Sequence, residues 1–299
     1  MTRTDLGEPS APIDYLVIGH IAKDLTPSGH RLGGTVSYAG LTASALGCRT
    51  ALVTACDSDL DLSPLAGLAR HMVSSAASTT FENIYGPQGR RQYLRAQAAP
   101  IPTAIIPAAW RSAPIVHVGP IAHEVPVETL ADIIAMAAAG PGRLVGLTPQ
   151  GWLRQWDSAG RVRPAAWPEA LSVLPQLGAV VFSIEDVQGD WQLVQQWAGV
   201  TSTLVVTQGA QGCTVFTRGQ PPKSFAPPSQ IETDPTGAGD IFAAAFFIRL
   251  HESRDAYAAA HFANHVAARS VGRTGLAGVP TAAEAALLRQ AHPVKAAAS

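Results

Sequence analysis

The chain has few charged residues and almost no charge imbalance. Of its 299 residues, 14% are charged and 47% are hydrophobic, and the formal net charge at pH 7 is −1. A chain this apolar can bury a sizeable core, which excludes general disorder. A net charge close to zero gives no electrostatic basis for binding nucleic acid or an acidic membrane surface.

Cysteine and long hydrophobic runs are also scarce. Cys48, Cys56 and Cys213 show no CxxC or CxxH spacing, so we expect reduced thiols without a metal or catalytic role. No apolar run approaches the length of a membrane span. Residues 1–10 lack the apolar segment of a signal peptide, and we therefore expect a cytoplasmic protein.

Short apolar runs alternate with helical patterns along the chain. Residues 15–19 read as a buried strand that ends in glycine, residues 35–46 as an alanine-rich helix, and residues 49–54 as a second strand. This alternation predicts an α/β fold, a doubly wound and mostly parallel sheet flanked by helices. The sequence indicates one domain over residues 1–299, because no second domain boundary is visible.

The most informative stretch is Asp-Pro-Thr-Gly-Ala-Gly-Asp at residues 234–240, which leads into an apolar helix. Such a turn leaves the N–H groups of Gly237, Ala238 and Gly239 unpaired at the positive end of the helix dipole. These donors can hold a phosphate, which glycine allows to approach closely. Asp240 then stands where a carboxylate could accept the proton of an attacking hydroxyl. In isolation, the string also fits an ordinary turn with an acidic residue at a helix start.

The whole motif resembles the C-terminal signature of the PfkB/ribokinase family of sugar and nucleoside kinases. The resemblance extends over nearly the whole chain, because Gly19, Asp24 and the pair Gly33-Gly34 follow the family order near the N-terminus. It implies a ribokinase-like fold in which Asp24, Gly33 and Gly34 bind substrate hydroxyls. A carboxylate suits this role, because its charge-assisted hydrogen bonds are short and strong.

Two substrate-side positions depart from the family pattern. The family often carries Asn where this chain has Thr35 and Tyr38. These positions shape the sugar site, so the resemblance implies a substrate other than ribose or fructose phosphate, with Thr35 and Tyr38 among its contacts. An inositol-like substrate is favoured.

A glycine- and proline-containing turn at residues 86–89 separates two segments rich in aromatic and β-branched residues, which predicts a β-hairpin. The resemblance implies that residues of about 79–100, together with about 20–35, form a small β lid over the substrate. Arg91 could reach a polar substrate from this hairpin, although a solvated strand residue is the simpler interpretation.

The phosphoryl donor side is matched by two further motifs. Thr207, Gly209 and Gly212 resemble the family T-x-G-x-x-G turn, which lies along the nucleotide phosphates. Asn264 and Gly275 fit positions that the family places near the adenine. The resemblance therefore implies that these residues bind ATP.

The family motif N-x-x-E is represented here by Ser183 and Asp186, with Glu185 beside them. Asp186 and Glu185 are therefore expected to hold Mg²⁺ through water, and hard oxygen ligands suit that ion. The alternative is an acidic cap for the next helix. Asp234 is a candidate ligand for a monovalent cation such as K⁺.

The sequence as a whole predicts an ATP-dependent phosphotransferase acting on a hydroxyl of a small polyol or sugar, with Asp240 as base. A nucleoside kinase is the alternative within this class. A non-catalytic ligand-binding or regulatory protein on the kinase fold is the alternative of another class, motivated by Ser183 and the altered substrate side. An NAD-dependent dehydrogenase is disfavoured by the missing G-x-G-x-x-G after the first strand. The small-molecule substrate is the one partner expected, and the sequence leaves open whether the chain forms a homodimer.

Overall fold

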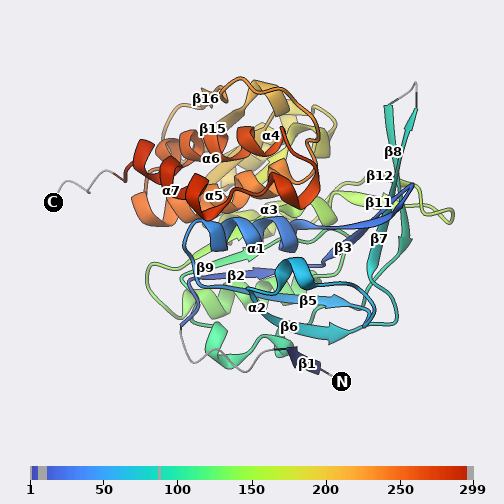
Figure 1. Ribbon diagram of the computed structural model, residues 1–299. Coiled ribbons are helices and arrows are strands. Elements are labelled where there is room, and N and C mark those ends of the chain that lie inside the picture. The colour runs from blue at the N-terminus through green and yellow to red at the C-terminus, as the bar shows by residue number, and fades with distance from the viewer. Residues whose placement is uncertain (1, 6–11, 87–88, 295–299) are drawn as a thin grey trace.

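A large, mostly parallel sheet runs through the molecule (Figure 1). The computed structural model describes residues 2–5, 12–86 and 89–294, and within them this sheet has ten strands. Every neighbouring pair from β6 to β14 is parallel, whereas β1, β15 and β16 are antiparallel to their neighbours. In spatial order the strands are β1 (Thr2–Asp5), β6 (Ala69–Ser74), β5 (Thr50–Cys56), β2 (Tyr15–Ile18), β9 (Ile115–Val118), β10 (Leu144–Leu147), β13 (Ala179–Ser183), β14 (Thr203–Thr207), β15 (Cys213–Thr217) and β16 (Lys223–Phe225).

Helices cover both faces of this sheet. One face carries α1 (Thr35–Ala45), α5 (Ala238–Ser253), α6 (Ala256–Ser270) and α7 (Ala282–Ala291), which Figure 1 shows together above the sheet. The other carries α2 (Val127–Ala138), α3 (Ala170–Val173) and α4 (Trp191–Val200). Because side chains alternate along a strand, Tyr15 and Val17 of β2 enter the first core, and Leu16 and Ile18 enter the second. The predicted doubly wound α/β fold is confirmed.

A second sheet is built from the two segments that the sequence assigned to a lid. Its order is β4 (Gly29–Gly33), β3 (Ala22–Thr26), β7 (Thr79–Gly86) and β8 (Gly89–Ala96). The β7–β8 hairpin projects from one end of the molecule (Figure 1), and residues 87–88 at its tip lie outside the described part. A small two-stranded sheet, β11 (Arg154–Trp156) with β12 (Val162–Pro164), lies next to β8, because Tyr93 bridges to Arg161.

Two segments contain short strands that the sequence analysis does not assign. Residues Thr2–Asp5 form β1, which pairs with β6. The tryptophan-rich segment at residues 152–167 contains β11 and β12. The rings of Trp152 and Trp167 are buried and stack with centroids 5.1 Å apart, which anchors both ends of this segment to the core.

The buried His117 has polar partners on both ring nitrogens, and the cysteines are unpaired with one another. His117 is fully buried in β9, and its two ring nitrogens lie 2.7 Å from Tyr15 Oη and 3.0 Å from Thr148 Oγ1. Burial lowers the pKa of His117 to about 3, so this imidazole is neutral. All the cysteines are free thiols. In the described part of the chain, no helix has the length and hydrophobicity needed to cross a membrane.

Glu124 fixes the edge of the sheet at which the parallel strands end. Its side chain is fully buried, and its carboxylate accepts hydrogen bonds from the backbone N–H groups of His20, Ile121 and Ala122 at 2.6–2.9 Å. His20 follows β2 and the other two donors follow β9, so one carboxylate joins the ends of adjacent strands. A buried charge is tolerated here because several donors surround it.

Replacing Glu124 by Gln should destabilise the protein by about 1–3 kcal/mol, because one of the buried N–H groups loses its acceptor. Urea unfolding monitored by circular dichroism measures this change. Glu128→Gln, an exposed position in the first turn of α2, is the matched control and should change stability by less than about 1 kcal/mol. Equal effects of the two substitutions would contradict this role for Glu124.

Candidate active site

The N-termini of α1 and α5 meet at the edge of the sheet where the parallel strands end. Gly237 precedes α5 with a φ of 80°, a left-handed conformation that glycine adopts without strain. A Cβ at this position would lie 2.4 Å from the ring of Tyr38, so only glycine fits. A 16-residue helix starts here, as the motif predicts. Of the three N–H groups expected to be unpaired, that of Ala238 is not, because it donates to the carbonyl oxygen of Pro235 at 3.1 Å across the tight turn.

Asp240 lies in the first turn of α5, and its Oδ1 accepts a 2.7 Å hydrogen bond from Thr35 Oγ1 of α1. Burial raises the pKa of Asp240 to about 6, against the lowering effect of the Thr35 hydrogen bond. The charge of Arg154 also lowers this pKa, and those of Asp186 and Asp24 raise it. A carboxylate with this pKa is ionised at neutral pH and is a stronger base than an ordinary aspartate.

Asp24 belongs to β3 and lies directly against the glycine pair. A Cβ on Gly33 would be 2.1 Å from Asp24 Oδ2, so a larger residue at position 33 would displace the carboxylate. Gly34 begins α1 with a φ of 84°, and its Cβ would be 2.6 Å from the carbonyl oxygen of His20. The structure therefore brings Asp24, Gly33 and Gly34 together close to Asp240.

The two positions that depart from the family pattern lie beneath the site. Thr35 and Tyr38 are 1% and 2% exposed. Thr35 orients Asp240 through its hydrogen bond, and the Tyr38 ring packs against Gly237. Burial is the main cause that raises the pKa of Tyr38, and the negative charges of Asp24, Asp240 and Asp234 raise it further. These three acids therefore lie near the same phenol group. Direct substrate contact by Thr35 or Tyr38 stays a prediction.

Of the residues predicted to bind substrate, Arg91 lies at a distance from Asp24 and the glycine pair. Asp24 pairs with Phe81 of β7, whereas Arg91 pairs with Ile84, three residues further toward the tip of the hairpin. At about 3.3 Å per residue, this separates the two positions by roughly 10 Å along the sheet.

Arg154 is a site residue that the sequence reasoning missed. Its positive charge lowers the pKa of both Asp240 and Asp186, so it lies near both carboxylates. Its guanidinium carbon also lies 5.8 Å from the centre of the Phe81 ring, in the second sheet. Arg154 starts β11, within the tryptophan-rich segment, and no motif marks it.

The T-x-G-x-x-G segment forms the turn between β14 and β15. Gly209 and Gly212 have positive φ values of 56° and 90°, and a Cβ on Gly212 would be 2.0 Å from the carbonyl oxygen of Phe225. Buried Asn264 of α6 donates to that same carbonyl oxygen at 2.9 Å. Thr207 ends β14 immediately before the turn. Asn264 thus holds the turn in place, and contact with a nucleotide stays a prediction.

Asp234 joins the glycine loop to the loop after α6. Its oxygens accept hydrogen bonds from the N–H groups of Thr236 at 3.0 Å and Gly275 at 3.1 Å. Arg31 lies 3.9 Å from the same carboxylate. Because Asp234 already has these partners, a monovalent cation bound there stays an untested expectation.

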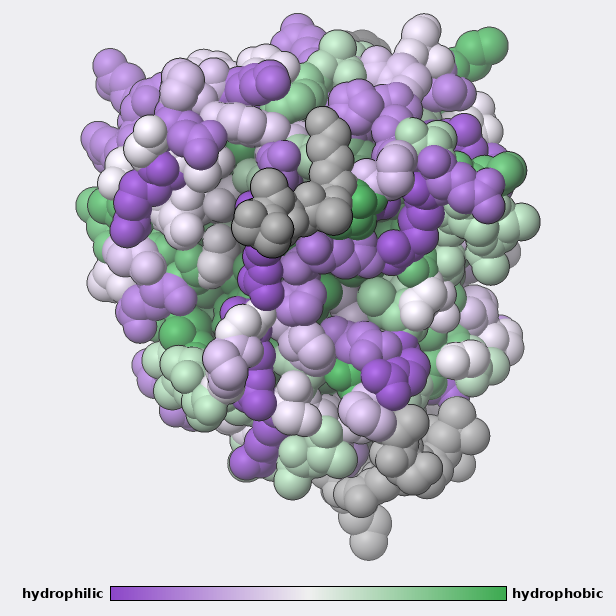
Figure 2. Space-filling model, turned by 90° about the vertical axis from the view of Figure 1, so that its left-hand side faces the viewer, coloured by the Kyte–Doolittle hydropathy of each residue, from purple (hydrophilic) through white to green (hydrophobic). Residues whose placement is uncertain are grey.

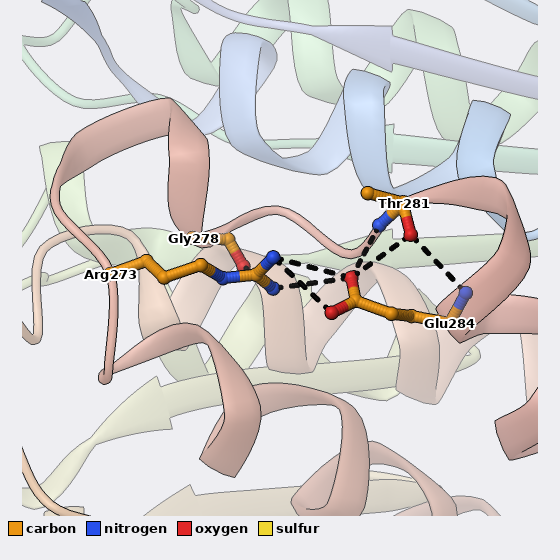
Figure 3. A network of polar contacts seen from close by, with 4 residues as sticks. All are labelled: Arg273, Gly278, Thr281 and Glu284. Atoms are coloured by element: carbon orange, nitrogen blue, oxygen red, sulfur yellow. Dashed lines mark hydrogen bonds and ion pairs between the residues drawn. The ribbon is translucent and has the colours of Figure 1, made fainter.

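The loop that contains Gly275 is fixed from its other side by α7 (Figure 3). The guanidinium of Arg273 reaches Glu284 at 3.3 Å and the carbonyl oxygen of Gly278 at 3.4 Å. Glu284 also accepts from the N–H of Thr281 at 2.8 Å, and the Thr281 hydroxyl accepts from the N–H of Glu284, which forms a capping box at the start of α7.

The expected magnesium ligands lie where β13 ends. Asp186 Oδ2 accepts from the N–H of Ser183 at 2.9 Å, and the Ser183 hydroxyl accepts from Glu185 N at 3.2 Å, so this segment is also a capping box. Burial raises the pKa of Asp186, against the lowering effect of Arg154. Glu185 is exposed. The helix cap is present, and the binding of Mg²⁺ by these acids through water stays a prediction.

Residues 180–282 match the model of the pfkB family of carbohydrate kinases, a range that includes the glycine motif, Asp240 and Asn264. Over this range, about a third of its length, the chain is similar to that kinase family. It is 28% identical to inositol 3-kinase of Oryza sativa subsp. japonica over 289 residues, which is 90% of this chain and 70% of that protein. It is 31% identical to inositol 3-kinase of Zea mays over 168 residues, 54% of this chain and 40% of that protein.

Solved structures of ribokinase-family kinases share the fold. A pyrophosphate-dependent kinase complexed with a pyrophosphate analogue and myo-inositol superimposes with a TM-score of 0.73 at 20% identity, over 87% of this chain and 96% of that chain. Arabidopsis thaliana ribokinase complexed with ribose and ATP gives 0.70 at 17% identity, over 93% and 99%. These similarities confirm the ribokinase-like fold.

The raised pKa of Asp240 makes a prediction about stability. The folded state binds this proton more tightly than the unfolded chain, whose aspartates titrate near about 4. The stability that this group contributes is therefore present below about pH 4 and lost as the pH rises through 6. Asp240→Asn keeps the acceptor for Thr35 but does not titrate. Its stability relative to the natural chain should thus be greater at pH 8 than at pH 4, by roughly 1–3 kcal/mol.

Urea unfolding at both pH values measures this difference. Asp132→Asn, on the exposed side of α2, is the control and should show no such pH dependence. A difference for Asp240→Asn that does not change with pH would show that Asp240 has no raised pKa.

Proposed function

We propose that this protein is an ATP-dependent kinase that phosphorylates a hydroxyl of an inositol-like polyol. The observation that carries the proposal is the position of Asp240, which combines a raised pKa, a hydrogen bond from Thr35 and a place in the first turn of α5. A base at a helix N-terminus is close to the donors that stabilise a transferring phosphoryl group. A binding protein has no chemical need for this combination.

The substrate class is supported by similarity and by the chemistry of the second sheet. Both curated relatives described above are inositol 3-kinases. A cyclic polyol presents several hydroxyls and no charge, and Asp24 is a carboxylate that can accept from two of them. Because Asp24 and Asp240 each raise the pKa of Tyr38, they approach the same phenol from different elements. A polyol between them would have one hydroxyl anchored and another aligned for transfer.

In the proposed reaction, Asp240 accepts the proton of the substrate hydroxyl as its oxygen attacks the terminal phosphoryl group in line. The bond from phosphorus to the bridging oxygen of the donor breaks, and ADP leaves. The N–H groups of Gly237 and Gly239 stabilise the charge on the transferring group, and that of Ala238 can join them only by leaving the carbonyl oxygen of Pro235. Thr35 holds the Asp240 carboxylate in one orientation. Arg154 lies near Asp240 and Asp186, where a cation favours phosphate oxygens.

Asp186 and Glu185 supply oxygen ligands of the kind that Mg²⁺ prefers, and the exposed Glu185 carboxylate leaves room for the water molecules that this ion retains. The residues therefore fit the ion. When bound, Mg²⁺ neutralises charge on the donor phosphates.

Product formation with Mg·ATP should be measured across inositols, pentoses, hexoses and nucleosides, with pyrophosphate as a second donor. We expect turnover of an inositol with ATP, and Asp240→Asn should lower kcat by at least about 10²-fold with little change in KM. If only nucleosides react, the assignment of the substrate is wrong. If the reaction proceeds with pyrophosphate but not with ATP, the assignment of the donor is wrong. If ATP binds but no compound reacts, the regulatory-protein alternative is favoured.

Arg154→Gln should lower kcat/KM by roughly 10²-fold, because a cation near the transferring phosphoryl group is lost. The same substitution removes a charge that lowers the pKa of Asp240. The acidic limb of the pH–rate profile should therefore move to higher pH. Arg163→Gln is the matched control, because this β12 arginine is 55% exposed and pairs with Asp157. A loss of rate without any movement of the acidic limb would contradict this placement of Arg154.

A further inference from the structure

Three histidines gather on the side of the molecule that carries α7, and neither the family motifs nor the proposed reaction uses them. One ring nitrogen from each of His261, His265 and His292 lies within 4.8 Å of the others. The ring centroids are 4.5 Å, 5.1 Å and 4.3 Å apart. It is the one group of three or more potential metal-ligating side chains found among the residues that the structure describes.

The fold brings these residues together from two elements. His261 and His265 are four residues apart on α6, so they lie on one face of that helix, one turn above the other. His292 directly follows α7, and its N–H donates to the carbonyl oxygen of Leu288, which holds it in the last turn. Its ring also packs edge-to-face against Phe262 at 6.2 Å. The cluster therefore joins the end of α7 to the middle of α6.

The imidazoles are in a suitable state to bind a cation. His265 Nδ1 lies 2.9 Å from the carbonyl oxygen of His261, and a carbonyl oxygen only accepts, so Nδ1 carries the proton and Nε2 is left with its lone pair outward. This is the common arrangement of metal-bound histidine, in which the second ring nitrogen donates to a backbone carbonyl. Burial, and for both residues the neighbouring imidazoles, lowers the pKa of His261 and His292.

The surroundings permit access by a small ion. His261 is exposed and the other two rings are half-buried. The face that carries α7 mixes hydrophilic and hydrophobic residues and shows no broad hydrophobic area (Figure 2). Arg249 and Arg269 are close enough to lower the pKa of His292 and would weaken cation binding. The charge of Arg249 is balanced in part by Glu252, 3.6 Å away.

We propose that His261, His265 and His292 bind a divalent transition-metal ion of the Zn²⁺ class, with water as the fourth ligand. Such an ion takes imidazole nitrogens at about 2 Å, which places neighbouring ligand atoms roughly 3.3 Å apart. The present separations of up to 4.8 Å close to this value by small side-chain rotations. The bound ion would fasten the end of α7 to α6, apart from the catalytic residues.

The test uses the full chain, treated with EDTA, desalted and titrated with ZnCl₂. We expect stoichiometric binding by calorimetry and a rise in Tm of roughly 5 °C when zinc reaches about 100 times its Kd. Co²⁺ in place of Zn²⁺ should give the visible absorption of a four-coordinate site and no thiolate charge-transfer band, because Cys48, Cys56 and Cys213 are not ligands. Binding that shows the thiolate band would overturn the proposal.

Substitutions separate this site from other histidines. His292→Ala and His265→Ala should each weaken Zn²⁺ binding by more than about 100-fold, because three-ligand sites depend on every ligand. Both variants should melt in EDTA within a few degrees of the natural chain, which shows that they fold. His30→Gln, an exposed histidine of β4, is the control and should leave Zn²⁺ affinity unchanged. Equal affinity in His292→Ala and the natural chain, or no stoichiometric binding at all, would overturn the proposal.

Discussion

The hydrogen bond from Thr35 to Asp240 is the interaction on which the rest of the site depends. It joins residues that are 205 positions apart and connects the first turns of α1 and α5. The Asp240 carboxylate is removed from water, so its charged form needs a hydrogen-bond donor that is held in a fixed position. Thr35 supplies it from a fully packed position, because a Cβ on Gly119, at the end of β9, would lie 2.4 Å from the threonine methyl group. The end of β9, the first turn of α1 and the Asp240 side chain are therefore held in fixed relative positions.

This arrangement follows from the order of the strands. The chain forms β2 in the centre of the sheet, then builds outward through β5 and β6 on one side and through β9 and β10 on the other. Connections diverge between β2 and β9, and ligands bind outside the carboxyl ends of strands at such a point. Glu124 ties these two strand ends, and the glycine pair begins α1 above them. The same edge thus receives groups from both halves of the chain.

The parts of the fold and site that could be predicted from the sequence are those that local chemistry determines. Continuous apolar runs gave the central strands, and the glycine motif gave the start of α5, because a left-handed residue before a helix leaves a recognisable signature. Arg154 was missed because its position depends on the pairing of β11 with β12 and on the stacked tryptophans. Neither feature can be recognised from a local hydrophobic pattern in the sequence. Thr35 was expected to face substrate, and its bond to Asp240 depends on a contact that only the folded chain creates.

The charges at this edge act as one set rather than as separate residues. Asp24 and Asp186 both raise the pKa of Asp240, and Arg154 lowers it, so the strength of the base depends on its neighbours. Arrival of a polyphosphate adds negative charge and makes Asp240 more basic, whereas any cation that accompanies it has the opposite effect. Because the acids exceed the arginines here, a polyanion would be repelled. In the proposed reaction, backbone N–H groups at the start of α5 offset this repulsion, because they attract phosphate without adding a cation that would lower the pKa of Asp240.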